Sequence, residues 1–233
     1  MVLTTTSPND VIIVACGIRV AGAGGDHCTT PTQISAGLTF YFRGSSAFST
    51  TDNVSEWFAI SAGSLTSAIV SCTATGTTKD ACNTFGISGA DTTAVYDSHS
   101  GLPVVTGSSS LVVPSVTGLS TENANDFLIG IYESTTGPTQ TADACCTLIV
   151  AVPSGGPAHN FAGSEYEIVA ALQSGTTIAF GKAATSNWVI LADAIAGENS
   201  VMIVSNSSDY LPLLLLPVAM IPFIFLVKRR RRR

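Results

Sequence analysis

Residues 88–99 gather oxygen-bearing side chains that could bind a cation. The stretch reads SGADTTAVYDSH and holds Asp91 and Asp97 among several hydroxyl groups. Calcium takes several oxygen ligands at once, and a loop of this composition offers them. The stretch lacks D-x-D-x-D-G spacing, so solvated turn acids are the alternative interpretation. We expect no cofactor, unless calcium binds at Asp91 and Asp97.

Three glutamates flank aromatic residues and could act as acids or bases. Glu56 precedes Trp57, whereas Glu165 and Glu167 stand on either side of Tyr166. Glycoside hydrolysis needs two carboxyl groups about 5–10 Å apart. Strand-entry positions at an edge or at the rim of a core explain these glutamates as well, and the chain has no GxSxG, HExxH or P-loop motif. We therefore predict a non-catalytic protein, with glycoside hydrolase as the least favoured function.

Aromatic side chains offer a second kind of chemistry, because an exposed ring presents a flat apolar surface to a ligand. Trp57, Tyr96 and Trp188 are our predicted ligand-binding residues. Both tryptophans lie in apolar segments, so the alternative is that they belong to the core. Carbohydrate is the ligand class that this chemistry favours.

Six cysteines complete the reactive side chains: Cys16, Cys28, Cys72, Cys82, Cys145 and Cys146. An even number in an exported domain indicates disulfides. The first two flank one turn-rich stretch and the next two flank another, so a bridge within each of these pairs is plausible. In a strand the adjacent cysteines would point to opposite faces, and one could then reach a distant partner. The pairing stays open, with buried free thiols as the alternative. No CxxC spacing supports zinc.

The elements that must position these side chains read as strands. Short apolar segments alternate with clusters of turn-forming residues at roughly ten-residue spacing, and no helical periodicity precedes residue 211. This pattern predicts an all-β protein, a two-sheet β-sandwich of jelly-roll or Greek-key type. The predicted strands are 11–16, 38–43, 56–60, 68–73, 84–88, 127–132, 147–152, 166–171, 176–180 and 188–195.

A weak internal sequence repeat suggests two similar halves, 9–100 and 125–197. Each half contains an Asn-Asp pair before an apolar strand and, later, a Ser-Glu pair before an aromatic residue. Chance matches between such short strings are the alternative. The Ser-, Pro- and Gly-rich stretch 101–121 would then be a linker or a long crossing loop.

The C-terminal residues predict a membrane anchor. Residues 211–227 read LPLLLLPVAMIPFIFLV, and KRRRRR follows at 228–233. An apolar segment ending in basic residues is typical of a single transmembrane helix with a cytoplasmic tail. Residues 198–210 would form a polar stalk, and 1–197 an extracellular domain. A buried core helix and a signal read by a sortase-like enzyme are the alternatives. The predicted membrane-flanking residues are Lys228, Arg229 and Arg230.

Charge separates the same two regions. The chain has ten Lys and Arg residues and sixteen Asp and Glu residues, and six of the cations lie in 228–233. The remaining residues therefore carry a net charge of −12, which argues against nucleic acid as a partner. The tail would face anionic lipid headgroups. The first fifteen residues lack the pattern of an export signal, so we expect one upstream. Asn53 and Asn206 match the glycan acceptor pattern.

The strings SPNDVIIV, GLTF, SEWFAI, ISGADTT, NANDFLIGIY, SEYEIV and NWVILADAI cover roughly residues 4–196. Together they are similar to an uncharacterised extracellular β-sandwich domain of archaeal and bacterial surface proteins and of tail-fibre-like phage proteins. The resemblance implies a jelly-roll or immunoglobulin-like fold and a surface location, and it implies no catalytic residues. We expect a membrane-anchored structural or adhesive protein of a surface layer or filament, with self-association as its interaction. A lectin-like module that binds surface glycans is the alternative.

Overall fold

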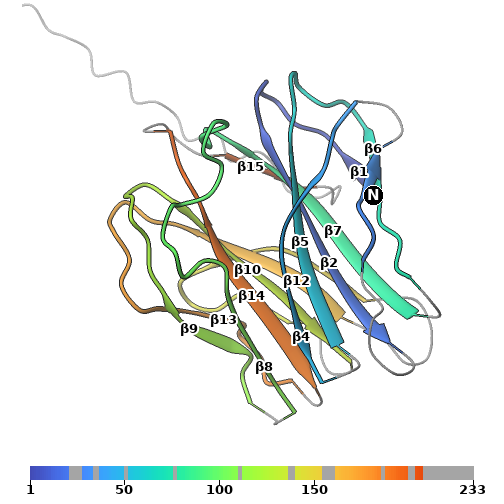
Figure 1. Ribbon diagram of the computed structural model, residues 1–233, viewed down its shortest axis with the longest axis vertical. Coiled ribbons are helices and arrows are strands. Elements are labelled where there is room, and N and C mark those ends of the chain that lie inside the picture. Colours follow the sequence, from blue (N-terminus) through green and yellow to red (C-terminus); the bar gives the residue numbers. More distant parts are fainter. Residues whose placement is uncertain are drawn as a thin grey trace, which may run out of the picture.

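The computed structural model describes residues 1–20, 28–33, 37–49, 52–75, 78–109, 112–135, 140–153, 161–184, 187–198 and 203–206. In these residues every regular element is a β-strand, and every pairing between strands is antiparallel (Figure 1). The all-β prediction is confirmed for this part of the chain. Within it there is no helix that could cross a membrane. The predicted transmembrane segment and basic tail, 211–233, lie outside the described residues.

Two five-stranded sheets form the centre of the molecule, and we call them the first and second sheets. The first has the order β15-β7-β2-β5-β4, with β15 at Ile203–Asn206, β7 at Thr78–Ser88, β2 at Val11–Val20, β5 at Asp52–Ile60 and β4 at Tyr41–Phe48. The second has the order β11-β12-β10-β14-β8, with β11 at Thr147–Pro153, β12 at Phe161–Ile168, β10 at Phe127–Ser134, β14 at Trp188–Ile195 and β8 at Val104–Ser108.

Two smaller sheets cover the outer faces of the central pair. The first cover has the order β1-β6-β3, from Val2–Leu3, Ala68–Ser71 and Thr32–Gln33. The second cover pairs β13, Thr176–Ala179, with β9, Ser115–Leu119. The stretch 101–121, expected to be a linker or crossing loop, therefore contains the whole of β8 and β9.

The central strands are apolar on both faces because both faces are covered. On β2, Val11 and Ile13 belong to the core between the two central sheets, whereas Ile12 and Val14 pack against the first cover. Every residue of β10 and of β14 is buried. Continuous apolar runs such as VIIVAC are typical of strands buried on both sides. The covers are the main difference from the predicted two-sheet arrangement.

The two central sheets have the same order of connections. In chain order, β2, β4, β5 and β7 of the first sheet correspond to β10, β11, β12 and β14 of the second. The spatial order β7-β2-β5-β4 therefore matches β14-β10-β12-β11. Asn9 and Asn125 precede the two central strands with φ of 60° and 64°, a left-handed conformation that asparagine tolerates. Register pairs Phe58 with Ile13 and Tyr166 with Ile129, which makes these two aromatics equivalent.

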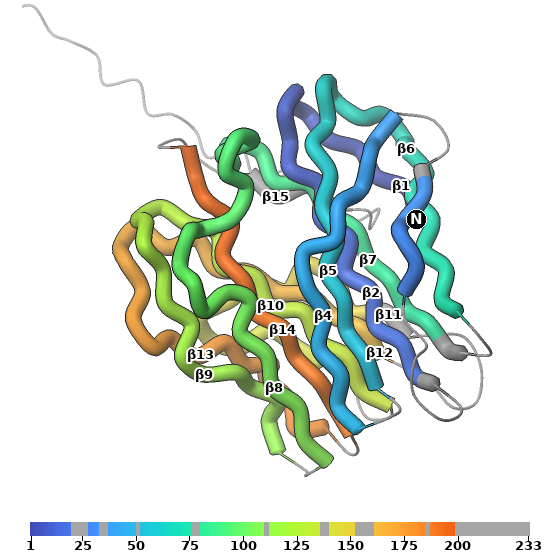
Figure 2. The backbone as a smooth tube through the Cα atoms, viewed as in Figure 1, coloured from blue at the N-terminus to red at the C-terminus, as the bar shows by residue number. Residues whose placement is uncertain are grey.

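The edge strands are exchanged between the halves. β8 follows β7 in the chain but pairs with β14, and β15 follows β14 but pairs with β7. In addition, β4 contacts both β14 and β8, beside which it lies in Figure 2. Each half therefore completes the sheet of the other.

Replacing Gly130 on β10 tests how tightly the second cover packs. A Cβ added there would lie 2.7 Å from Cγ2 of Ile178 on β13, so Gly130→Ala forces the cover outward. Overpacking of this kind should lower the free energy of unfolding by about 1–3 kcal/mol, measured by urea denaturation. Gly163→Ala is the matched control, because its Cβ would have no neighbour closer than 3.4 Å. Equal effects of the two substitutions would contradict this packing.

Candidate functional site

A pocket of 270 Å³ lies on the outer face of the first sheet, over β4 and β5. Its lining residues are Cys28, Phe42, Ser45, Asn53, Ser55 and Trp57. None of them carries a charge. The rings of Phe42 and Trp57 meet edge to face, with centroids 5.0 Å apart and an interplanar angle of 63°. The pocket thus combines two aromatic walls with neutral polar groups.

Strand alternation brings the lining residues together. Asn53, Ser55 and Trp57 occupy every second position of β5, so their side chains project from the same face of the strand. Across the ladder, Phe42 is opposite Trp57 and Ser45 is opposite Ser55. An irregularity between Phe42 and Gly44 keeps both β4 residues on this face, because it shifts the register by one position.

Three polar atoms of the pocket residues have no hydrogen-bond partner. They are Oδ1 of Asn53, Oγ of Ser55 and Nε1 of Trp57, all on the same face of β5. Ser55 is only 2% exposed. A buried polar group without a partner costs roughly 1–3 kcal/mol, so such groups are normally satisfied by water or a ligand. Their gathering beside one pocket indicates a site for a ligand that is rich in hydroxyl or amide groups.

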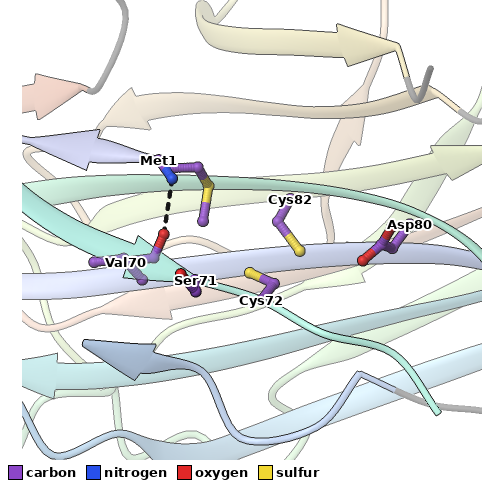
Figure 3. A pocket seen from close by; sticks show the side chains of 6 residues that line it. All are labelled: Met1, Val70, Ser71, Cys72, Asp80 and Cys82. Atoms are coloured by element: carbon purple, nitrogen blue, oxygen red, sulfur yellow. Dashed lines mark hydrogen bonds between the residues drawn. The ribbon is translucent and has the colours of Figure 1, made fainter. Parts of the chain in front are cut away.

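Cys28 closes one side of the pocket through a disulfide. It is bonded to Cys16 on β2, and an isolated bridge pairs it with Ala74. Cys72 and Cys82 are free thiols near this disulfide, and Figure 3 shows their sulfur atoms facing each other. Of the two bridges that the sequence makes plausible, Cys16–Cys28 is formed, whereas Cys72 and Cys82 are free thiols in this structure.

The adjacent cysteines are bonded to each other. Cys145–Cys146 is a disulfide, which rules out in this structure the distant partner that a strand would have allowed. The reason is local: residues 144–145 form a turn, and β11 begins only at Thr147. The Sγ atoms of both lie within 4.8 Å of a carboxylate oxygen of Glu167.

The structure separates the three predicted ligand-binding aromatics. Trp57 lines the pocket, and its contact with a ligand stays a prediction. Trp188 is 4% exposed and belongs to the core beneath the second cover, where it cannot reach a ligand. Tyr96 lies against the core between the sheets and donates its hydroxyl to Glu56. Phe42, the second wall of the pocket, was not predicted.

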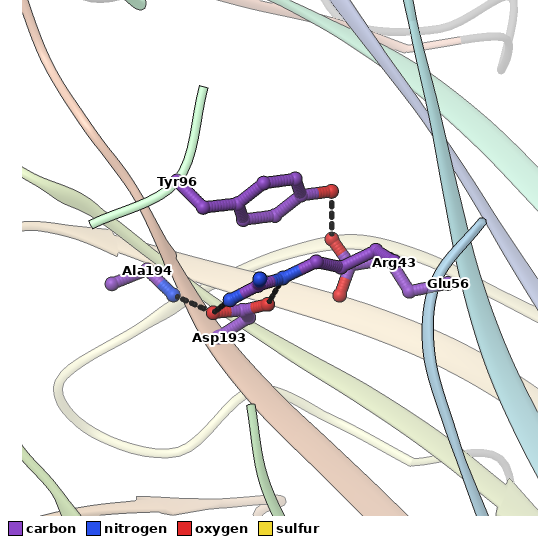
Figure 4. A network of polar contacts seen from close by, with 5 residues as sticks. All are labelled: Arg43, Glu56, Tyr96, Asp193 and Ala194. Carbon is purple, nitrogen blue, oxygen red and sulfur yellow. Dashed lines mark hydrogen bonds and ion pairs between the residues drawn. The ribbon is translucent and has the colours of Figure 1, made fainter. Parts of the chain in front are cut away.

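A buried polar network joins the two central sheets (Figure 4). Arg43 on β4 donates from Nε to Asp193 Oδ2 at 2.6 Å and from Nη2 to Oδ1 at 3.1 Å. Tyr96 donates from Oη to Glu56 Oε1 at 2.7 Å, and Arg43 Cζ lies 4.1 Å from the centre of the tyrosine ring. Neither Glu56 nor Asp193 is exposed at all.

The electrostatics of this network fit a structural role. Burial, reinforced by the charge of Asp193, raises the pKa of Glu56 well above its usual range. Burial also raises the pKa of Asp193, although Arg43 acts in the opposite direction. A neutral acid beside a carboxylate resembles an acid–base pair, but neither group lines a pocket found among the described residues. The network is instead a bridge between sheets.

Glu56 and Glu165, two of the three glutamates considered for hydrolysis, lie on opposite sides of the second sheet. Glu56 faces the space between the sheets, where it meets Tyr96. Glu165 faces outward, because it is paired with Gly130, whose open side meets Ile178 of the second cover. Glu165 accepts the backbone N–H of Asp143 at 3.2 Å. Glu56 is therefore not brought together with Glu165, whereas Glu167 lies on the same face of β12 as Glu165.

Asp91 and Asp97 each accept hydrogen bonds from N–H groups. Oδ1 of Asp91 accepts from the backbone of Thr93 and Ala94, at 2.6 and 3.0 Å. Asp97 accepts from the backbone N–H groups of His99, Glu122 and Asn123 and from the Asn123 amide. Burial alone would raise the pKa of Asp97, but these bonds hold it below its usual value. Both carboxylates thus close turns, and calcium binding there stays a prediction.

The predicted glycan acceptors lie on β5 and β15. Asn53 is half-buried beside the pocket, and its carbonyl oxygen is one of the unpartnered atoms. Asn206 is the last residue of β15. Glycosylation at either position stays a prediction.

Comparison with known proteins assigns no family or function to the chain. The chain matches no family of known proteins, and neither a curated protein nor a solved structure is significantly similar to it.

Glu165 and Asp126 should make stability depend on pH. Burial raises the pKa of Glu165 to about 8, and burial together with Asp97 raises that of Asp126 to about 7. The folded protein therefore keeps protons that the unfolded chain releases near pH 4. Their stabilising contribution is complete below that pH and is lost as the pH rises through about 7 to 8.

Glu165→Gln removes one of these titrations and should flatten the fall in unfolding free energy between about pH 4 and 8, measured by urea denaturation. The amide oxygen can still accept the N–H of Asp143. Glu167→Gln, two residues along the same strand, is the matched control for the loss of one carboxylate from this strand. If both variants kept the wild-type slope, the assigned titration of Glu165 would be wrong.

Proposed function

We propose that this protein is a membrane-anchored surface adhesin that binds neutral carbohydrate in the pocket between Phe42 and Trp57. The observation that carries the proposal is the coincidence of two aromatic walls with three unpartnered polar atoms in one pocket. Catalysis is not part of the proposal, because no carboxyl group lines this pocket.

The chemistry of the pocket suits a sugar. The apolar C–H face of a pyranose ring stacks on an aromatic ring, and its hydroxyl groups both donate and accept hydrogen bonds. Trp57 Nε1 donates, Asn53 Oδ1 accepts and Ser55 Oγ does both. The absence of charge in the lining favours a neutral hexose or N-acetylhexosamine over an acidic sugar. Phe42, 53% exposed, is the wall that can turn aside to admit the ring.

The surface location rests on the C-terminal sequence. An apolar segment over 211–227 followed by six basic residues supports a single-pass anchor with the β-rich part of the chain outside the cell. We assign that part to the jelly-roll or Greek-key sandwiches on the sequence resemblance and on the two face-to-face sheets. Adhesion through glycans, rather than assembly into a lattice, is the role that the pocket favours.

Phe42→Ala should abolish most of the binding. On a glycan array probed with the full chain, the wild type should bind a subset of neutral sugars. Loss of one stacking wall should weaken that binding about tenfold, equivalent to roughly 1.4 kcal/mol. Tyr41→Ala is the matched control, because Tyr41 is equally exposed but projects from the opposite face of β4, against Phe58.

Two results would overturn the carbohydrate assignment. One is that the wild-type protein binds no sugar on the array. The other is that Phe42→Ala and Tyr41→Ala weaken sugar binding equally. A mass increase on Asn53 that corresponds to a glycan would also do so, since the pocket would then hold a sugar of the chain itself.

The anchor is tested separately from the ligand. We expect the full chain to stay with membranes during alkaline carbonate extraction, and a variant that ends after Asn206 to be released. On intact cells, added protease should remove the β-rich part and leave the basic tail protected. Release of the full chain into the aqueous phase, or protection of the β-rich part, would contradict the proposed placement.

A further inference from the structure

Four cysteines meet where the first cover lies on the first sheet. Cys16 and Cys82 belong to the sheet and are direct partners across β2 and β7. Cys28 and Cys72 belong to the covering side, where Cys28 is bridged to Ala74 and Thr29 is hydrogen-bonded to Thr73. The four side chains pack into one cluster. Each layer thus contributes two of the four sulfur atoms.

The existing disulfide joins the two layers, and the remaining thiols are placed to do the same. Cys16–Cys28 runs from sheet to cover. The Sγ atom of Cys82 lies within 4.8 Å of both sulfur atoms of that bond. The thiols of Cys72 and Cys82 interact with each other, and Figure 3 shows their sulfur atoms facing each other.

We propose that Cys72 and Cys82 are an oxidation site that forms a second disulfide between the first cover and the first sheet. The oxidant is a small disulfide such as oxidised glutathione. One thiol of the pair, as thiolate, displaces one glutathione and forms a mixed disulfide. The other thiol then displaces the second glutathione, so two thiols and one small disulfide give one protein disulfide and two small thiols.

The thiols are open to such an oxidant. Both are partly exposed and line a surface pocket of 280 Å³ together with Met1, Val70, Ser71 and Asp80. A reagent can therefore reach them without opening the cover. The hydrogen bond with Cys72, together with burial, raises the pKa of the Cys82 thiol well above its usual range. Oxidation should consequently be faster at higher pH, since the thiolate is the reacting form.

A second bridge parallel to the first would fix the cover at two points. The proposal does not depend on the carbohydrate assignment, because it concerns only how the cover is held. It does compete with a metal site. A tetrathiolate zinc centre would need all four sulfur atoms reduced, and Cys16–Cys28 already uses two of them.

Tryptic mapping gives a direct test, because the four cysteines fall on four different peptides. Cleavage after Arg19, Arg43 and Lys79 leaves Cys72 on 44–79 and Cys82 on 80–182. Peptide 80–182 also carries the Cys145–Cys146 disulfide, so the linked cysteine is assigned by fragmentation of the linked species in the mass spectrometer. The full chain is incubated with oxidised glutathione, denatured, treated with N-ethylmaleimide and digested. We expect peptides 44–79 and 80–182 to be recovered as one disulfide-linked species, without a maleimide adduct on either.

Three outcomes would overturn the proposal. Maleimide adducts on Cys72 and Cys82 would show that the pair stays reduced. Linkage of either peptide to 1–19 or 20–43 would show a different pairing. Zinc in the purified protein, measured by elemental analysis together with adducts on all four cysteines, would show a metal centre instead.

Stability provides a second measurement on the same chain. The double variant Cys72→Ser/Cys82→Ser should unfold several degrees lower than the oxidised wild type, because the bridge constrains the unfolded chain. Under reducing conditions that difference should largely vanish. Cys145→Ser/Cys146→Ser is the matched control, since its disulfide closes no loop of comparable length. An equal fall in melting temperature in both double variants would contradict a second disulfide between the first cover and the first sheet.

Discussion

The requirement that both central sheets be covered on both faces governs the rest of the structure. Strands β10 and β14 are buried along their length and β2 is buried over 11–18, so each central sheet needs a layer beyond its partner sheet. Two short sheets provide those layers, and each combines a strand that precedes one half, β1 or β9, with strands from within that half. The space left beside the first cover is where the pocket and the cysteine cluster lie. The proposed binding pocket and the proposed second cross-link thus both lie where a short cover ends over a long sheet.

The interior between the central sheets is not uniformly apolar. Arg43 reaches from the edge strand of one sheet to Asp193 on the other, and Glu56 and Tyr96 complete the group. Removing one partner from such a group leaves an uncompensated charge, which is far more costly than replacing the whole group. The network therefore favours one alignment of the two sheets over others that would bury the same apolar area.

Much of this architecture is readable from the sequence, and the failures have physical causes. Unbroken apolar runs mark the central strands correctly, and the period-two spacing of Asn53, Ser55 and Trp57 is the signal for one wall of the pocket. The same runs do not reveal what covers them, so a strand buried on both faces cannot be told from one with an exposed face. Trp188 was assigned to a ligand for that reason. The partnership of Arg43 with Asp193 spans 150 residues and leaves no local pattern. The turn at 144–145 decided the pairing of the adjacent cysteines, and strand propensity gave no hint of it.

The exchange of edge strands has a mechanical consequence for a tethered molecule. β15, the described strand nearest the proposed tether, is at one edge of the first sheet, whereas β4 and β5, which carry the pocket, are at the other. Tension between a surface-bound ligand and the tether would pass across the β15–β7, β7–β2 and β2–β5 ladders in series. The second sheet would lie outside that line of force and would act as a brace that resists distortion of the first.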